Sequence, residues 1–236
     1  MIVSTDPDYL DTKLIKQGVK QLNPIFQELA GWIHQKFDTP VLNIYYDKID
    51  TDKDRPRLSI IFEYQQKVEK FIDHIGNYDT EKQNLIAGQF RQILKSNSIP
   101  NRSFLDRLFK KSQASQFDTD RLFVIFTAFE PIAREEVNHK IHQTEIDELK
   151  RVLASKNVWE VYREFATTTY FFYTDKQIED YINDGTTETM RQQYFDLLKK
   201  YDEFDYIKPD TYLLTFDSKE NFDKSFESNW FYYSRR

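Results

Sequence analysis

The sequence predicts an α+β protein built from two related modules, each a small, mainly antiparallel sheet with helices packed on one face. The first observation is an internal repeat: residues 59–73, SIIFEYQQKVEKFID, align without gaps with residues 169–183, TYFFYTDKQIEDYIN. Both segments change from an apolar run to a helical pattern, as a strand followed by a helix does. The second observation is an aromatic content of 16%, which can supply two hydrophobic cores in 236 residues.

The first module is expected to cover residues 1–130. Apolar residues spaced by three and four predict a helix over residues 12–36, with a possible bend at Pro24. Two β-branched and aromatic runs flank the polar stretch DTDKDRPR, which predicts a hairpin over residues 41–64. The remaining elements of this module are two helices and a strand, at residues 66–75, 80–95 and 122–129.

The second module is expected to cover residues 131–236 and to repeat this order of elements. A helix is predicted from Pro131 to about residue 154, followed by a hairpin over residues 158–174. The last piece, residues 219–236, alternates loosely and is predicted as a terminal strand or hairpin arm. Between the hairpin and that piece the patterns predict two helices and a strand, at residues 177–183, 188–204 and 210–217.

A helical insertion near residues 97–118 distinguishes the first module from the second. Aromatic and basic side chains interleave there, which can indicate nucleic-acid binding. A short amphipathic helix that covers the core explains the same pattern, and the net charge of −6 disfavours a polyanionic partner. We therefore predict no nucleic-acid partner.

The composition excludes several further classes of protein. Cysteine is absent, so disulfide staples and thiolate chemistry are excluded. No apolar run approaches the roughly 20 residues that span a bilayer, and the first residues, MIVSTDPDYLD, do not resemble a signal peptide. We therefore expect a cytoplasmic protein without a membrane partner.

Catalytic motifs are also missing from the sequence. Neither a glycine-rich phosphate loop nor a nucleophile elbow occurs, so we expect no cofactor and no catalytic residues. The alternative is a metal-dependent enzyme that uses Glu136, His139 and His142, which lie on neighbouring turns of a predicted helix. A solvated helix face explains the same cluster, and no second segment offers further ligands of this pattern.

The excess negative charge lies in the second half of the chain. Residues 1–120 carry 17 basic and 17 acidic side chains, whereas residues 121–236 carry 16 basic and 22 acidic ones. Acidic side chains for electrostatic steering, interleaved with aromatic anchors, are typical of a surface that binds a basic protein. Aromatic residues buried in the core beneath solvating acids are the alternative. The predicted partner-binding residues are Asp202, Glu203, Asp205, Asp217, Glu220, Asp223, Glu227 and Trp230.

The second module resembles the YezG-like immunity proteins, bacterial partners of polymorphic toxins, in the order and texture of its segments. The likeness is carried by VWEVYREFATTTYFFY, by YFDLLKKY and by TYLLTFDSKENFDKSFESNWFYY, which include Trp159, the run from Tyr170 to Tyr173, and residues 216–233. It covers about 100 residues, and the first module matches only in outline. The resemblance implies a protein that binds and neutralises a toxin domain without catalysis.

Together these observations predict a non-catalytic binding protein, of immunity type, whose acidic and aromatic surface neutralises a basic toxin domain. Two alternatives stay open at this point: the metal-dependent enzyme described above, and a regulatory or scaffolding protein with an unrelated partner.

Overall fold

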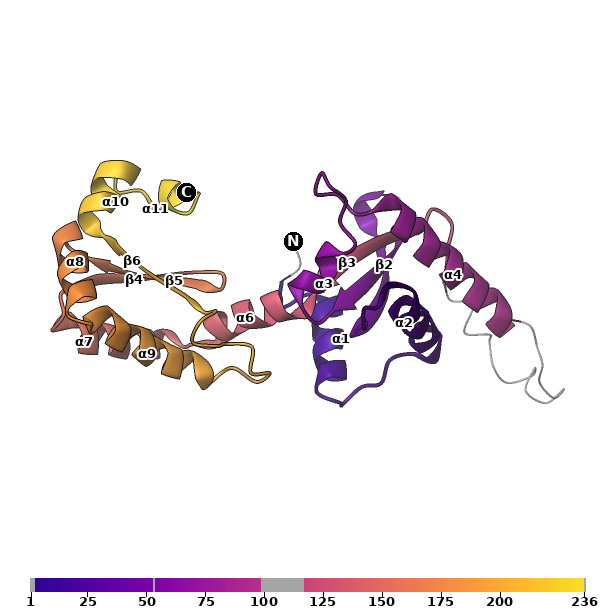
Figure 1. Ribbon diagram of the computed structural model, residues 1–236, viewed down its shortest axis with the longest axis horizontal. Coiled ribbons are helices and arrows are strands. Elements are labelled where there is room, and N and C mark those ends of the chain that lie inside the picture. Colours follow the sequence, from indigo (N-terminus) through magenta and orange to yellow (C-terminus); the bar gives the residue numbers. More distant parts are fainter. Residues whose placement is uncertain (1–2, 53, 99–116, 236) are drawn as a thin grey trace. The chain divides into compact units, whose positions relative to one another are not determined.

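The computed structural model describes residues 3–52, 54–98 and 117–235 (Figure 1). The chain divides into two compact units, Met1–Ile132 and Ala133–Arg236. Residues 99–116 lie outside the described part, and with them most of the predicted helical insertion near 97–118.

The described residues of the first unit form a three-stranded sheet with helices around it. The strand order is β1-β2-β3; β1 and β2 pair antiparallel, whereas β2 and β3 pair parallel. A short 3-10 turn, η1 (Asp50–Asp52), follows β1. The elements are α1 (Pro7–Lys16), α2 (Pro24–Phe37), β1 (Asn43–Ile49), β2 (Arg55–Phe62), α3 (Gln65–Glu69), α4 (Thr80–Ser98) and β3 (Phe123–Ala128).

The second unit repeats this plan in its described residues. Its strand order is β4-β5-β6, again with an antiparallel hairpin and a third strand parallel to the central one. Helix α6 (Phe129–Lys140) leads into this unit. The other elements are α7 (Gln143–Ala154), β4 (Val158–Glu164), β5 (Thr167–Phe172), α8 (Asp175–Asn183), α9 (Thr186–Lys199), β6 (Leu213–Ser218), α10 (Lys219–Phe226) and α11 (Trp230–Tyr233).

These two modules, each a three-stranded sheet packed against helices, confirm the predicted α+β class. Both predicted hairpins are present. The structure adds a parallel strand pair to each sheet, because a pair of helices carries the chain from the central strand to the third strand. It also adds helices to the opposite sheet face, with α1 beside β2 in the first unit and α10 and α11 over β5 in the second.

The repeat found in the sequence has the same strand register in both units. Ser59 of β2 lies opposite Ile125 of β3, and its counterpart Thr169 of β5 lies opposite Thr215 of β6. The two copies are offset by 110 residues in the central strand and by 90 residues in the third strand, so the pairing register is kept although the connection between these strands is shorter in the second unit. The gapless sequence alignment covers the central strand and the helix after it, and the shared register relates the third strands as well.

One backbone hydrogen bond extends this register beyond the strands in both units. The N–H of Glu130 donates to the carbonyl of Glu63 at 2.9 Å in the first unit. The N–H of Glu220 donates to the carbonyl of Tyr173 at 3.2 Å, at the equivalent positions of the second unit. The bond holds the start of the helix after the third strand against the residue that follows the central strand.

A helix side chain also covers the same carbonyl on the third strand of each unit. Gln83 of α4 donates to the carbonyl of Val124 at 2.5 Å, and Arg191 of α9 donates to the carbonyl of Leu214 at 2.5 Å. Val124 and Leu214 are equivalent in the repeat. Because β3 and β6 are edge strands, these contacts satisfy a backbone acceptor that would otherwise be open to another strand.

The main core of each unit lies between the sheet and its long helices. In the first unit, buried side chains of α2 and α4, including Leu29, Ile33 and Phe90, pack against alternate residues of β2 such as Ile60 and Phe62. The corresponding core of the second unit is formed by α7, α9 and alternate residues of β5 and β6. Alternate residues of the central strands therefore meet an apolar helix face, while the residues between them are buried against the opposite face of the sheet.

A buried polar network connects α6 to the second sheet. Asn138, which is 2% exposed, accepts a hydrogen bond from the hydroxyl of Tyr194 at 2.6 Å and donates to the carbonyl of Phe165 at 2.8 Å. Thr168 in turn donates to the oxygen of Tyr194 at 2.8 Å. Arg163 donates to the carbonyl of Asn138 at 2.8 Å, so the end of α6 is bonded to the hairpin through both backbone and side chains.

Both long helices expected at the start of the modules are interrupted. The predicted helix over residues 12–36 is two helices, because α1 ends before Gly18, whose φ of +74° is typical of a helix C-terminus, and Asn23 caps α2 at Pro24. The predicted helix from Pro131 breaks after Lys140. There the backbone N–H of His142 bonds to the carboxylate of Glu145 at the start of α7.

The terminal piece is helical and not the predicted strand or hairpin arm. Ser218 accepts a hydrogen bond from the N–H of Asn221 at 2.8 Å and so caps α10. Asn229 accepts one from the N–H of Phe231 at 2.9 Å and caps α11. Two capping residues ahead of apolar positions therefore outweigh the loose alternation of this segment.

Within the described ranges, no helix is both long enough and apolar enough to cross a membrane.

Replacing Tyr170 and Tyr194 by phenylalanine should have opposite effects on stability. Both rings are buried and contact each other, but the hydroxyl of Tyr170 has no hydrogen-bond partner among the described residues, whereas that of Tyr194 has two. We expect Tyr194→Phe to lower the free energy of unfolding by about 1–3 kcal/mol and Tyr170→Phe to leave it unchanged or raise it by up to about 1 kcal/mol. Urea unfolding of both variants provides the measurement, and equal losses would contradict the hydrogen-bond assignment.

Candidate functional site

The predicted acidic and aromatic stretch separates into two groups in the structure. Asp202, Glu203 and Asp205 lie in the loop after α9. The other predicted residues lie from the end of β6 to α11. Each group has its own neighbours, so they are described in turn.

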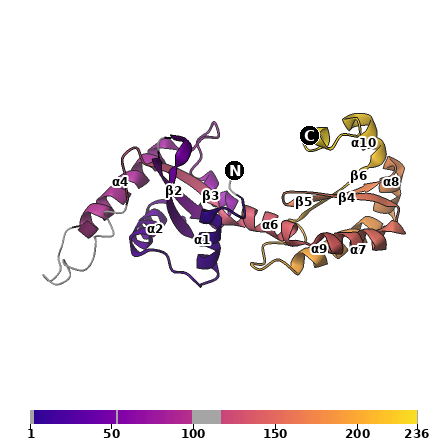
Figure 2. The ribbon, with the colours of Figure 1, turned by 180° about the vertical axis from the view of Figure 1, so that it is seen from behind.

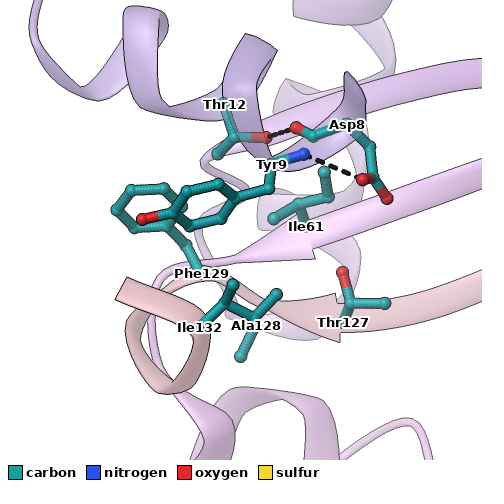
Figure 3. A pocket seen from close by; sticks show the side chains of 8 residues that line it. All are labelled: Asp8, Tyr9, Thr12, Ile61, Thr127, Ala128, Phe129 and Ile132. Carbon is teal, nitrogen blue, oxygen red and sulfur yellow. Dashed lines mark hydrogen bonds between the residues drawn. The ribbon is translucent and has the colours of Figure 1, made fainter. Parts of the chain in front are cut away.

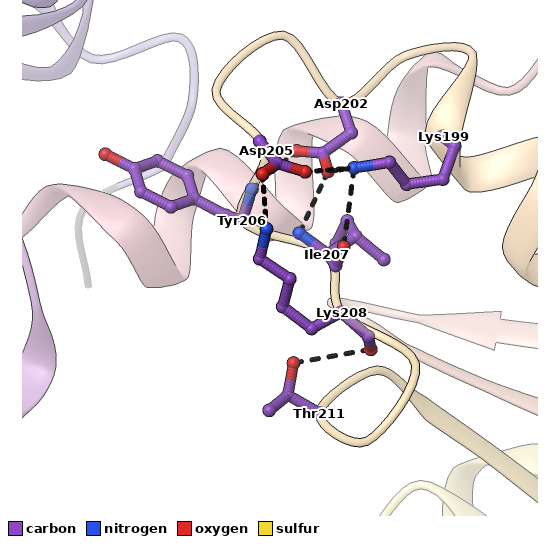
Figure 4. Close-up of polar contacts among 7 residues, drawn as sticks. All are labelled: Lys199, Asp202, Asp205, Tyr206, Ile207, Lys208 and Thr211. Atoms are coloured by element: carbon purple, nitrogen blue, oxygen red, sulfur yellow. Dashed lines mark hydrogen bonds and ion pairs between the residues drawn. The ribbon is translucent and has the colours of Figure 1, made fainter.

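In the loop after α9, Asp202 organises the backbone (Figure 4). Its carboxylate accepts hydrogen bonds from the N–H groups of Tyr206 and Ile207, both at 2.9 Å. Lys199 lies 2.6 Å from the same carboxylate. The side chain of Asp202 is only 1% exposed. This acid therefore stabilises the loop, and the structure places it away from the surface expected from the sequence.

Two lysines neutralise the neighbouring carboxylate of Asp205. Lys199 bonds to one of its oxygens at 2.6 Å, and Lys208 bonds to the other (Figure 4). Hydrogen bonds from these two lysines lower the pKa of Asp205 to about 2. Glu203 is exposed nearby. The loop thus offers much less net negative charge than its sequence suggests.

Asp217 is also an internal residue rather than a surface one. It is 9% exposed and accepts hydrogen bonds from the hydroxyl of Tyr233 at 2.7 Å and from the amide of Asn221 at 2.9 Å. These bonds join β6, α10 and α11 on the sheet face opposite the main core of the second unit. The expectation that Asp217 faces a partner is corrected: its carboxylate is enclosed because α11 folds over it.

Trp230 packs into the same aromatic layer. Its ring stacks on Tyr162 of β4 with centroids 4.7 Å apart and planes at 6°, and lies 4.2 Å from the ring of Phe222. The indole is half-buried. Trp230 therefore holds α11 on the sheet, and the structure gives this predicted anchor a packing role.

The remaining predicted acids, Glu220, Asp223 and Glu227, are exposed on and beside α10. A carboxylate oxygen of Glu220 accepts a hydrogen bond from the N–H of Asp175 at 3.3 Å. Asp223 pairs with Lys219 and accepts a bond from the hydroxyl of Ser228 at 2.7 Å, and Lys219 lowers its pKa. These acids keep their carboxylates at the molecular surface.

Helix α8 contributes further acids to this region, which the sequence analysis did not single out. Because β5 and β6 run parallel, α8 and α10 start at the same edge of the sheet, and both lie at that end of it in Figures 1 and 2. From there α8 packs on the face of the main core and α10 on the opposite face. The hydroxyl of Ser218 donates to the carboxylate of Asp175, which joins the two helix starts. We call the following exposed residues the acidic surface: Asp175, Glu179, Asp180, Glu220, Asp223 and Glu227.

The repeat itself holds the signal that could have identified the acids of α8. In the alignment, Asp175 takes the place of Gln65 and Asp180 the place of Lys70. The framework positions are apolar in both copies, whereas these two exposed positions gain negative charge in the second copy. A comparison of charges at aligned positions would have added α8 to the predicted site.

The alternative metal site is not assembled by the described residues, among which no group of three or more histidine or acidic side chains could hold an ion. Glu136 lies 3.4 Å from Lys140, and His139 lies 3.9 Å from Glu135 on the same helix. His142 belongs to the corner between α6 and α7, after the helix has ended. The helix break therefore separates residues that a continuous helix would have brought onto adjacent turns.

A small pocket lies in the first unit, where α1 meets the carboxyl ends of β2 and β3 (Figure 3). Ile61, Thr127 and Phe129 line it together with Asp8 and Tyr9 of α1. Its interior measures about 10 Å³, which is room for about one water molecule. The pocket is therefore too small for a metabolite or a nucleotide.

Asp8 is the titratable group of this pocket. It is 6% exposed, and one carboxylate oxygen accepts a hydrogen bond from the N–H of Tyr9 at 2.8 Å. Burial raises the pKa of Asp8; the bond from Tyr9 opposes that shift, while the nearby charge of Asp6 adds to it.

Comparison of the chain with protein-family models, with curated proteins and with solved structures gave no significant match. The function is therefore inferred from the residues of this chain and from its resemblance to the YezG-like proteins.

Substitution of Asp8 and of Asp205 by asparagine should change stability with opposite pH dependence. The raised pKa of Asp8 means that its stabilising effect is present below its ordinary value of 3.8 and is lost as pH rises. The lowered pKa of Asp205 means that its stabilising effect is present above 3.8 and is lost as pH falls through about 2.

We therefore expect the free energy of unfolding of Asp8→Asn, relative to that of the wild type, to be higher at pH 7 than at pH 3. Asp205→Asn should unfold more easily than the wild type at pH 7, and this difference should shrink as the pH falls toward 2. Urea unfolding across this pH range measures both. Asparagine tolerates the φ of +59° at position 205, so backbone strain does not obscure the comparison. Parallel pH profiles for the two variants would contradict the assigned shifts.

Removal of the Tyr233 hydroxyl should destabilise the second unit. Tyr233→Phe takes a donor away from the buried carboxylate of Asp217, at an expected cost of about 1–3 kcal/mol. Tyr232→Phe is the matched control, because the adjacent Tyr232 is 49% exposed and the same change should cost less than about 0.5 kcal/mol. Thermal or urea unfolding measures the difference, and equal stability of the two variants would rule out the proposed role of the bond.

Proposed function

We propose that the chain is a non-catalytic binding protein of immunity type, which neutralises a basic toxin domain through the acidic surface on α8 and α10. The observation that carries this proposal is the distribution of charge. The second unit, residues 133–236, has 15 basic and 21 acidic side chains, whereas residues 1–132 have 18 of each. The whole net charge of −6 therefore belongs to the second unit.

An excess of six negative charges in one unit favours a basic partner. Opposite charges steer diffusional encounter and raise the association rate, while like-charged macromolecules such as nucleic acids are repelled. The acids of α8 and α10 are supported by capped helix starts that share one sheet edge. They are therefore presented on regular elements rather than on a loop that would have to be ordered on binding.

The divergence of the repeat supports the same surface. Core positions of the two copies keep their apolar character, for example Phe62 and Phe172, which are both fully buried. Exposed positions on α8 differ in charge from their counterparts, as Asp180 does from Lys70. A change confined to the surface of one copy is the pattern expected when one copy acquires a binding role while both keep the fold.

The immunity role comes from the resemblance to YezG-like proteins. The segments that carry the resemblance include β4, β5, β6 and α10, which form or support the acidic surface.

Charge reversal tests the proposal. The triple variant Glu179→Lys, Asp223→Lys and Glu227→Lys should weaken binding of a basic partner by tenfold or more, because it changes the charge of the acidic surface by six units. The partner to use is the protein encoded by the neighbouring gene. Affinity is measured by titration of the purified proteins, and function by rescue of growth during co-expression.

The matched control reverses three exposed helical acids of the first unit, Glu28→Lys, Glu69→Lys and Glu81→Lys. It changes the net charge equally, so it should leave affinity within about threefold if the acidic surface is specific. An equal loss for both triple variants would show a general charge effect. Absence of a complex together with absence of growth rescue would refute the immunity role.

A further inference from the structure

We infer that Phe231 and Tyr232 of α11 form an aromatic anchor beside the acidic surface, and that they receive arginine side chains of a basic protein partner. This inference rests on the proposed function and adds the contact that would distinguish one basic partner from another.

The two faces of α11 differ sharply in burial. Tyr233 is 1% exposed and Trp230 is half-buried against the sheet, whereas Phe231 is 54% exposed and Tyr232 is 49% exposed. The outward rings lie beside each other, with centroids 6.0 Å apart and planes at 58°. Two adjacent aromatic rings on one turn thus provide apolar area that is still exposed.

The inward residues fix the position of this outward pair. Stacking of Trp230 on Tyr162 and the bond from Tyr233 to Asp217 hold both ends of α11 on the sheet. The side chain of Asn229 caps the turn by accepting a bond from the N–H of Phe231. Aromatic side chains that are held in place before binding lose little conformational entropy on binding and are favoured as binding hot spots.

The structure contains a guanidinium group on one of these rings. The Cζ atom of Arg235 lies 3.9 Å from the centroid of the Phe231 ring. This distance is typical of a cation–π contact and shows that the exposed ring accepts a planar cation. An arginine of a partner can replace Arg235 on Phe231 or stack on Tyr232 in the same way.

Carboxylates of α10 and of the turn after it precede the rings in the chain and would pair with the bound cation. Helices α10 and α11 contact each other, and the hydroxyl of Ser228 between them bonds to Asp223 at 2.7 Å. Glu227 is exposed at the same turn. Arginine combines a stacking plane with a bidentate donor group, whereas lysine is a compact point charge, so this combination of rings and carboxylates favours arginine.

Peptide binding provides the test. Fluorescently labelled deca-arginine and deca-lysine are titrated with the full chain at low ionic strength, and polarisation gives the affinities. We expect the wild type to bind deca-arginine more tightly than deca-lysine. The double variant Phe231→Leu and Tyr232→Leu keeps apolar side chains but removes both rings, and should weaken deca-arginine binding by about fivefold to tenfold while leaving deca-lysine within about twofold.

Two comparison variants complete the design. Tyr64→Leu with Ile75→Leu alters two exposed apolar residues of the first unit and should leave both affinities unchanged. The triple reversal of Glu179, Asp223 and Glu227 should weaken both peptides.

The outcomes separate the two claims. If the triple reversal weakens both peptides but the double leucine variant binds deca-arginine as the wild type does, or loses both peptides equally, the aromatic anchor is refuted and the acidic surface stands. If the wild type binds neither peptide, both claims fail.

Discussion

The register between the central and the third strand of each sheet determines the positions of the remaining features. In both units one backbone hydrogen bond, from Glu130 to Glu63 and from Glu220 to Tyr173, continues the parallel pairing into the following helix. Because parallel strands end at the same edge, the helices that follow them begin side by side. In the second unit those helices are α8 and α10, so the register is the reason that acids 45 residues apart in sequence, such as Asp175 and Glu220, become neighbours.

The two units differ most in what covers the second face of the sheet. In the first unit α1 lies over this face, and Tyr9 stacks on Phe129 with centroids 5.0 Å apart. In the second unit α10 and α11 cover the equivalent face, with Trp230 and Tyr233 against the sheet. The second face of the first sheet is thus covered by α1, which precedes the hairpin, and that of the second sheet by α10 and α11, which follow the third strand. The sheets are alike in the two units, but the helices on this face are not.

The sequence predicted the duplicated framework because both copies keep buried residues at the same spacing, as with Phe62 and Phe172. It failed to place the helix ends, since an apolar periodicity runs through Gly18 and His142 while local capping stops the helix there. The sequence also predicted more exposed acidic residues than the structure has. Composition counts Asp202 and Asp217 as negative charges but does not reveal that backbone N–H groups and a tyrosine hydroxyl enclose them.

The residues of helix α6 take part in the packing of both units. Its first residue, Phe129, stacks on Tyr9 in the first unit, while Val137 and Ile141 at its end and just beyond it are buried in the core of the second. A cut between Ile132 and Ala133 would divide α6 and break its backbone hydrogen bonds. Both fragments would then lose stability. The boundary between the units therefore falls inside a helix, and a fragment that is to keep either core intact has to carry the whole of α6.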